Sequence, residues 1–262
     1  MRKNNICFKS STIPDAKLEG TCFSRLYEGQ DIIIFTDVDI KKGLMAPYSE
    51  IEDKRVWLVE PRELIREIYI LVLQTLPNWT KVYTADKDFL KLVNHLHPGK
   101  GIYSPYGDQW VTDTKKYDKI KDISMIASTK DFLPGHHMRH EVIRKYGHMF
   151  DRNVERIEKK EELLSGYAYS IAIENVSVPS YYTEKLLDCF ATRTVPIYWG
   201  APDISDHFDI RGIIEFNTVK GLGMVLPECN MKLYASMKEA IENNYKLAQK
   251  VNHCVFNIER CL

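Results

Sequence analysis

The stretch YYTEKLLDCFATRTVPIYWGAP, residues Tyr181–Pro202, carries the pattern that decides the fold. Its first half places Leu186, Leu187 and Phe190 at the spacing of one helix face. Its second half, VPIYWG, is a short apolar run rich in β-branched and aromatic residues. A helix that leads directly into a buried strand is the repeating unit of parallel sheets, so this stretch predicts an α/β fold.

The same alternation runs along most of the chain and predicts two Rossmann-like domains with a cleft between them. Strand-like runs occupy residues 31–37, 55–61, 81–86, 123–128, 168–175, 195–200 and 212–216. Helical patterns occupy residues 63–76, 89–96, 136–146, 183–192 and 236–252, and GIYSPYG at 101–107 reads as a loop. The polar stretch DTKKYDKIKD, at 113–122, is the predicted linker, which gives domains of residues 1–120 and 121–262.

Composition excludes several classes of protein. The 262 residues carry 36 basic and 36 acidic side chains, a net charge of zero that gives no general electrostatic case for a nucleic-acid partner. The longest apolar patch, Ile68–Leu73, is too short to span a bilayer, and no signal-peptide core follows Arg2 and Lys3. Six scattered cysteines without a CxxC pair favour reduced thiols and a cytoplasmic location, with a Cys254–Cys261 pair left open.

The start of the helix in the quoted stretch has chemistry of its own. Thr183 is a suitable N-cap, and Glu184 and Lys185 lie in the first turn. A lysine there opposes the helix dipole, so it is either a solvated surface charge or part of an anion site. In the second reading Lys185 contacts a phosphate and Glu184 accepts hydrogen bonds from a ribose diol.

The neighbouring residues favour the second reading. A predicted strand ends in Glu174-Asn175, and Tyr181 lies in the loop before the helix. Ligands of open α/β sheets bind outside the carboxyl ends of strands. A nucleotide needs a phosphate clamp, a ribose acceptor and an aromatic or amide wall, and this segment offers all three.

A diphosphate calls for a second cation. Arg139, in a helix that follows a predicted strand, is the best candidate because a guanidinium binds phosphate bidentately. Lys130 and His136 are weaker candidates in the same region. His136, His137 and His140 lack the HExxH relation, so no metal site is predicted.

These residues resemble a known family. AIENVSVPSYYTEKLLDCFATRTVPIYWGAP is similar to the donor-site motif of the inverting α-1,3-fucosyltransferases, which reads roughly F-E-N-S…D-Y-V-T-E-K-L…G-T-V-P-V-V-x-G. DIIIFTD, VWLVEP, PNWTKVYTADKDF and the Pro105-Tyr106-Gly107 triplet resemble further family segments in the same order. The resemblance covers about residues 31–250.

The resemblance implies a GT-B fold, with GDP-fucose held mainly by the C-terminal domain and a glycan acceptor received by the N-terminal one. Glu184 resembles the ribose-binding glutamate and Lys185 the phosphate-binding lysine. Asn175 and Tyr181 resemble donor-site residues, and Arg139 resembles the arginine that pairs with the diphosphate. No cofactor is expected to be required, and stimulation by a divalent metal is left open.

An inverting transfer needs a base that takes the proton of the acceptor hydroxyl. Glu60, which resembles the glutamate of the family's E-S-P segment, is the first choice. The alternative is that Glu60 only caps a helix with Pro61 at its first position. Asp86 and Asp88, in TADKD, are the fallback candidates.

The chain also departs from the family pattern. Thr84 stands where the family has an arginine, and VWLVEP lacks the family's serine. The absence of an anchor or stem points to an enzyme of bacterial or viral type rather than a Golgi-anchored one. A related GDP-sugar in place of GDP-fucose stays open, as do the acceptor and the oligomeric state.

Two other functions remain in competition. Asp37-Val38-Asp39 follows an apolar strand, as the DxD of metal-dependent GT-A glycosyltransferases does, although a turn explains the two aspartates equally well. A non-catalytic protein that binds a nucleotide sugar or glycan with the same fold is the second alternative. A kinase or P-loop enzyme is disfavoured because GxxxxGK[ST] is absent from the sequence.

Overall fold

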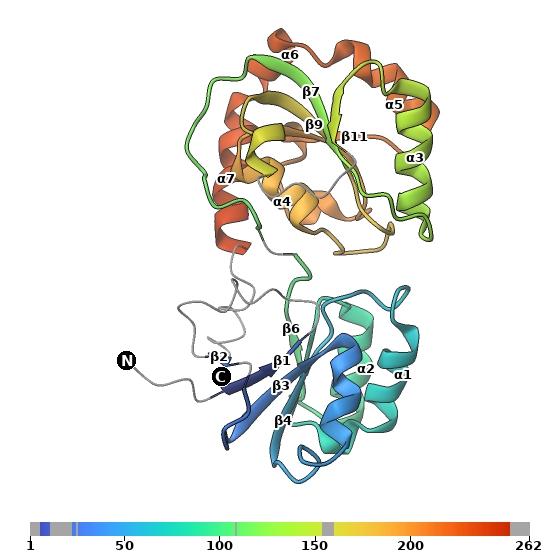
Figure 1. Cartoon of the computed structure of the whole chain (residues 1–262), viewed down its shortest axis with the longest axis vertical. Helices are drawn as coiled ribbons and strands as arrows, with labels where there is room; N and C mark the ends of the chain where they lie inside the picture. Colours follow the sequence, from blue (N-terminus) through green and yellow to red (C-terminus); the bar gives the residue numbers. More distant parts are fainter. Residues whose placement is uncertain (1–5, 11–22, 25, 108, 154–159, 252–262) are drawn as a thin grey trace. The chain divides into compact units, whose positions relative to one another are not determined.

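The computed structural model describes residues 6–10, 23–24, 26–107, 109–153 and 160–251. The chain divides between Tyr106 and Gly107 into two compact units, each built on one parallel sheet (Figure 1). This confirms the predicted α/β class. Cys254 and Cys261 lie outside the described residues. Of the helices in the described ranges, none is long and apolar enough to cross a membrane.

The sheet of the first unit has six strands in the order β2-β1-β3-β4-β5-β6, all parallel. The strands are β1 (Ile6–Lys9), β2 (Phe23–Ser24), β3 (Ile32–Thr36), β4 (Asp53–Trp57), β5 (Lys81–Thr84) and β6 (Gly101–Tyr103). The helices are α1 (Arg66–Gln74) and α2 (Lys87–Leu96), with the 3-10 segments η2 (Asp37–Leu44) and η3 (Leu76–Asn78).

Side chains of the first sheet alternate between two apolar clusters. Phe35 and Val56 pack with α1 and α2 on one face, and Phe8, Trp57 and Tyr83 form a cluster on the other. Alternation along a strand places successive side chains on opposite faces. Both faces are therefore apolar, as is typical of a parallel sheet.

The sheet of the second unit has five parallel strands in the order β11-β10-β9-β7-β8. The strands are β7 (Lys121–Ile126), β8 (Asp151–Asn153), β9 (Tyr167–Ile173), β10 (Val195–Trp199) and β11 (Ile214–Glu215). The helices are α3 (Pro134–Tyr146), α4 (Glu184–Ala191), α5 (Val219–Val225), α6 (Met231–Ser236) and α7 (Lys238–Val251). Four 3-10 segments complete the unit: η4 (Lys160–Leu163), η5 (Ile204–Asp206), η6 (Ile210–Gly212) and η7 (Leu226–Glu228).

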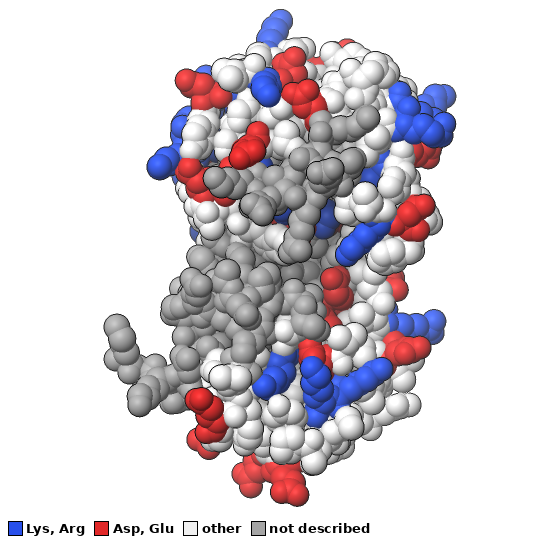
Figure 2. Space-filling model, viewed as in Figure 1, with Lys and Arg blue, Asp and Glu red and all other residues white. Residues whose placement is uncertain are grey.

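Helices cover both faces of this second sheet. Tyr169 and Ile171 pack with Val142 of α3 and Leu222 of α5, whereas Ala172 packs in the cluster that includes α4. Figure 1 shows α3 and α4 on opposite sides of the sheet. The strand order reverses between β7 and β9, because β8 pairs with one edge of β7 and β9 with the other. A reversal of this kind leaves an opening for ligands at the carboxyl ends of the two strands. Charges of both signs are intermixed on the visible described surface of the molecule (Figure 2), as a net charge of zero suggests.

The boundary between the units differs from the one predicted at residue 120. Trp110 N and Val111 N donate hydrogen bonds to Asp188 Oδ1, at 2.7 and 2.9 Å, and Thr112 N donates to Glu161. The segment after Gly107 therefore already belongs to the second unit. Its polar composition reflects exposed side chains, while its backbone is anchored by bonds that composition does not reveal.

Candidate functional site

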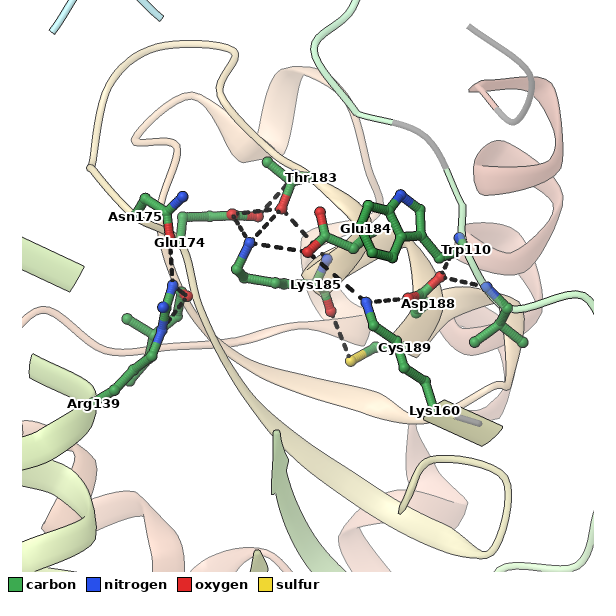
Figure 3. A network of polar contacts seen from close by, with 12 residues as sticks. Trp110, Arg139, Lys160, Glu174, Asn175, Thr183, Glu184, Lys185, Asp188 and Cys189 are labelled. Carbon is green, nitrogen blue, oxygen red and sulfur yellow. Dashed lines mark hydrogen bonds and ion pairs between the residues drawn. The ribbon is translucent and has the colours of Figure 1, made fainter. Parts of the chain in front are cut away.

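The residues predicted to bind a nucleotide gather where the strand order of the second sheet reverses. β9 ends at Ile173, and Glu174 and Asn175 follow it directly. The helix after the neighbouring strand β7 is α3, which carries Arg139. Figure 3 shows these side chains beside the first turn of α4, so segments far apart in sequence contribute to one cluster.

The first turn of α4 is built as the sequence predicts. Thr183 is the N-cap, and its Oγ1 accepts a hydrogen bond from Lys185 N at 3.4 Å. Lys185 Nζ lies 3.1 Å from both Thr183 Oγ1 and Glu184 Oε1, and 3.7 Å from Glu174 Oε2 (Figure 3). The lysine is about a quarter exposed, at 24%. It therefore places a positive charge at the helix N-terminus while remaining accessible to a ligand.

Glu174 supports this turn from inside the protein. Its side chain is fully buried and accepts hydrogen bonds from Thr183 N at 2.8 Å and Thr183 Oγ1 at 2.7 Å. Burial raises the pKa of this carboxyl, against the lowering effect of Lys185. Glu174 thus holds the cap of α4 in place, and its direct contact with a donor stays a prediction.

Glu184 is held ionised. Burial acts to raise its pKa, but the ammonium groups of Lys185 and Lys160 outweigh burial and lower the pKa to about 2. Its Oε1 lies 3.1 Å from Lys185 Nζ and 3.8 Å from Lys160 Nζ. A carboxylate that stays charged at neutral pH is a strong acceptor for hydroxyl groups.

The lowered pKa of Glu184 predicts a pH-dependent contribution to stability. The pKa is about 2 in the folded protein against an ordinary value of 4.5, so the stabilisation is present above pH 4.5 and is lost as the pH falls toward 2. Glu184→Gln cannot titrate. We expect the free energy of unfolding of wild type to fall more than that of the variant over this window, by at most about 3 kcal/mol.

Urea unfolding of both proteins at a series of pH values between 7 and 2 measures this difference. Glu162→Gln, at an exposed glutamate of the same unit, serves as the control and should follow wild type. The same loss of stability in wild type and Glu184→Gln would contradict the assigned pKa.

Arg139 and Asn175 form a second part of the cluster. Arg139 is 4% exposed, and its Nε and Nη2 donate to Ile173 O at 3.0 and 2.5 Å. Nη2 also donates to Asn175 Oδ1 at 2.9 Å, and Asn175 Nδ2 lies 3.5 Å from Tyr181 OH. These contacts connect α3, the end of β9 and the loop before α4 to one another.

The close seating of α3 against β9 depends on a glycine. A Cβ at Gly135 would lie 1.8 Å from Glu174 O, a distance at which the backbones would have to separate. Gly135 N instead donates to Asn175 O at 3.0 Å. The absence of a side chain therefore lets the start of α3 meet the end of β9.

His136 and Lys130 lie beside this cluster. His136 is 2% exposed, and burial together with the charges of Arg139, Lys130 and Lys185 lowers its pKa to about 4. It is therefore neutral at physiological pH. Lys130 is exposed, and its backbone carbonyl lies 2.9 Å from His140 Nε2. Within the ranges that the structure describes, no group of three His, Cys, Asp or Glu residues is arranged to hold a metal ion.

Three residues of the cluster were not found from the sequence. Lys160 Nζ lies 2.9 Å from Asp188 Oδ2 and 4.7 Å from the centre of the Trp110 ring (Figure 3). Asp188 is 1% exposed. A carboxylate four residues after Glu184, among the apolar residues of α4, was a visible signal of a buried partner. Lys160 stands in a run of charged residues, where nothing marks it as different from its neighbours.

The predicted base candidates lie in the first unit. Glu60 is half-buried, and it lies beyond the end of β4. The alternative that it caps a helix beginning at Pro61 is wrong, because α1 begins only at Arg66. A turn at 61–64 intervenes, since Leu64 N and Ile65 N both donate to Pro61 O.

Asp86 and Asp88 are engaged in local contacts. Asp86 is the N-cap of α2, where its Oδ1 accepts from Phe89 N at 2.9 Å, and its Oδ2 lies 2.7 Å from Arg62 Nη2. Asp88 is exposed and pairs with Lys91 at 2.9 Å. Their role as fallback bases stays a prediction, and both carboxylates already have structural partners.

Comparison with known proteins finds a family model that matches part of the second unit. Residues 135–228 match the model of the family described as glycosyltransferase family 10 (fucosyltransferase), C-terminal. An α-(1,3)-fucosyltransferase of Helicobacter pylori is 33% identical over 64 residues, which are 24% of this chain and 13% of that protein. α-(1,3)-Fucosyltransferase B of Drosophila melanogaster is 27% identical over 179 residues, which are 53% of this chain and 39% of that protein. The chain therefore aligns with less than two thirds of either relative.

Solved structures are similar over most of the chain. An α1,3-fucosyltransferase crystallised with GDP matches with a TM-score of 0.54 and 14% identity, over 88% of this chain and 80% of that one. Anabaena Alr3699/HepE in complex with UDP-glucose matches with a TM-score of 0.63 and 10% identity, over 87% and 77%. These likenesses confirm the predicted GT-B fold. They do not favour the GT-A alternative built on Asp37 and Asp39.

Proposed function

We propose that the chain is an inverting glycosyltransferase, because residues 135–228 match the model of glycosyltransferase family 10, the fucosyltransferases. The proposed reaction transfers L-fucose from GDP-fucose to a hydroxyl group of an acceptor glycan. The observation that carries the proposal is the first turn of α4, where Glu184 and Lys185 follow the Thr183 N-cap at the reversal of the strand order. A non-catalytic role is not favoured by the family and its relatives.

The donor site is proposed to work by charge. Lys185 and the positive end of the α4 dipole would bind the diphosphate, and the ionised Glu184 would accept hydrogen bonds from the ribose. Arg139 would add a second cation. Its Nε and Nη2 are used on Ile173 O and Asn175, and among the described residues no acceptor is bonded to its Nη1. Stabilising the charge that develops on the departing GDP is the main catalytic contribution of such cations.

Glu60 is proposed as the general base that takes the proton of the acceptor hydroxyl. Its resemblance to the family glutamate and its half-buried position beyond the end of a strand support the choice. We further propose that the first unit receives the acceptor and that the second, which begins at Gly107, binds the donor. A cytoplasmic setting is also proposed, in keeping with the free thiols of Cys7, Cys189 and Cys229.

A nucleotide screen tests the proposal directly. Thermal unfolding would be followed with GDP-fucose, GDP-mannose, UDP-glucose and a CMP-sugar, because a ligand that binds only the folded state raises its melting temperature. GDP-fucose is expected to give the largest rise. GDP release from GDP-fucose would then be measured with a panel of oligosaccharide acceptors. Binding of GDP-fucose without transfer to any acceptor would support the non-catalytic alternative.

Metal chelation gives a further prediction. Because Lys185 and Arg139 are proposed to neutralise the diphosphate, transfer in the presence of EDTA is expected to stay within about twofold of the untreated rate. The measurement is GDP release before and after EDTA, with added Mn²⁺ as the second condition. Loss of turnover with EDTA and its recovery with Mn²⁺ would show that a divalent cation carries part of this work.

A further inference from the structure

We propose that Asp37 is a positioning residue that holds Glu60 in place for proton transfer, an inference that rests on the proposed role of Glu60 as the base. Asp37 directly follows β3 and is 2% exposed. Its carboxylate Oδ1 accepts hydrogen bonds from Val59 N at 2.9 Å and from Glu60 N at 3.2 Å. One oxygen of Asp37 therefore binds both amides of the segment that presents Glu60.

The other side of the Glu60 residue is held as well. Tyr69 OH donates to Glu60 O at 3.1 Å, and Tyr69 is 1% exposed within α1. The same hydroxyl lies 3.1 Å from Thr84 Oγ1 and 3.2 Å from Tyr106 OH. The N–H and the C=O of Glu60 are thus fixed by groups from two different elements, which restricts where its side chain can begin.

The backbone of Asp37 supports a specific role. Its φ of 44° lies in the left-handed region, which residues other than glycine rarely adopt and which aspartate and asparagine tolerate best. Residues other than glycine that are held in such a conformation cluster at functional sites. This conformation occurs where the chain turns from β3 into η2. It allows the side chain of Asp37 to accept hydrogen bonds from the amides that follow β4. Position 37 therefore needs both tolerance of positive φ and a short acceptor side chain.

This arrangement also accounts for the Asp-Val-Asp motif without a metal. Asp37 Oδ1 accepts hydrogen bonds from two amides, and Asp39 Oδ1 lies 2.5 Å from Lys42 Nζ. A metal ligand and an amide acceptor respond differently to substitution by asparagine. Asparagine loses the carboxylate charge that a divalent cation needs, but its side-chain oxygen still accepts hydrogen bonds.

Substitutions at position 37 separate these requirements. Asp37→Asn keeps the acceptor and tolerates positive φ, so kcat should stay within about threefold of wild type. Asp37→Gly permits the backbone conformation but removes the acceptor, so kcat should fall about 10- to 100-fold through misplacement of the base. Tyr69→Phe, which loses the donor to Glu60 O, should lower kcat in the same direction. In all three variants KM for GDP-fucose should stay within about twofold of wild type.

The assay is GDP release with GDP-fucose and the best oligosaccharide acceptor, supported by urea unfolding to show that each variant is folded. Wild-type kcat in Asp37→Gly, or an equal loss in Asp37→Asn and Asp37→Gly, would overturn the inference. In a Glu60→Gln background Asp37→Gly should cause no further loss, and a further loss would also overturn it.

Turnover of Glu60→Gln distinguishes a failure of the proposed base from a failure of the positioning role of Asp37. Normal turnover of Glu60→Gln would remove Glu60 as the base, whatever Asp37→Gly does. Normal turnover of Asp37→Gly together with an inactive Glu60→Gln would leave the base assignment intact and remove only the positioning role.

Discussion

Glu60→Gln is expected to abolish nearly all transfer while leaving GDP binding unchanged. Glutamine keeps the shape of the side chain but cannot take a proton, so a reaction that depends on this base should slow by about 10²- to 10⁴-fold. The backbone bonds from Glu60 to Asp37 and Tyr69 do not involve the carboxylate and should persist. The measurement combines kcat from GDP release with the calorimetric affinity for GDP.

A matched control is available three residues away. Glu63 is exposed in the turn at 61–64, and Glu63→Gln should behave as wild type in both measurements. Normal turnover of Glu60→Gln would show that another group accepts the proton, with Asp86 the next to be tested. Loss of GDP affinity in Glu60→Gln would instead mean that Glu60 contributes to donor binding.

Lys185→Ala is expected to weaken GDP binding about 10- to 100-fold. A hydrogen bond from an ammonium to a phosphate contributes about 1.5–3 kcal/mol, which corresponds to this change in Kd. The substitution also removes the cation that helps to lower the pKa of Glu184. Calorimetric titration with GDP measures the effect, and the affinity should become less sensitive to salt because one ionic contact is gone.

Lys220 provides a control with the same local setting. It is the second residue of α5 and follows the Thr218 N-cap, as Lys185 is the second residue of α4 and follows Thr183. Lys220 is exposed, and Lys220→Ala should leave GDP binding unchanged. An affinity of Lys185→Ala within about twofold of wild type would reject the donor-site assignment.

Most of the long elements could be predicted because their signals are local. The cap at Thr183 and the apolar face of α4 stand within a dozen residues, and the strands β9 and β10 are apolar runs. β1 (Ile6–Lys9) was missed, although it lies between β2 and β3. Its short run of Ile6, Cys7 and Phe8 becomes a strand through pairing with β3, which no local pattern records. β6, expected as a loop, is likewise a three-residue strand beside β5.

In the candidate site too, residues with a local sequence signal could be predicted, and residues placed by long-range contacts could not. Glu184, Lys185 and Asn175 could be proposed from the sequence because they lie at the end of a strand or at the start of a helix, positions at which open α/β sheets commonly bind ligands. Lys160 could not be found, since its place beside Asp188 depends on the path of a separate segment. The alternative that Glu60 caps a helix was wrong because Pro61 begins a turn, and the distant partners Asp37 and Tyr69 show how the backbone of Glu60 is held.

If the second unit binds a nucleotide as proposed, the contacts of Asp188 provide a way to detect it. The amides of Trp110 and Val111 are bonded to a carboxylate one turn along the helix that carries Glu184 and Lys185. Solvent exchange of those two protons requires the bonds to Asp188 to open. If a bound nucleotide stabilises α4 and makes this opening rarer, the two equilibria are coupled. Thermodynamic reciprocity then requires that keeping the 110–111 segment closed raises the affinity for the nucleotide. Hydrogen exchange at the amides of the 110–111 segment would then report whether a nucleotide is bound.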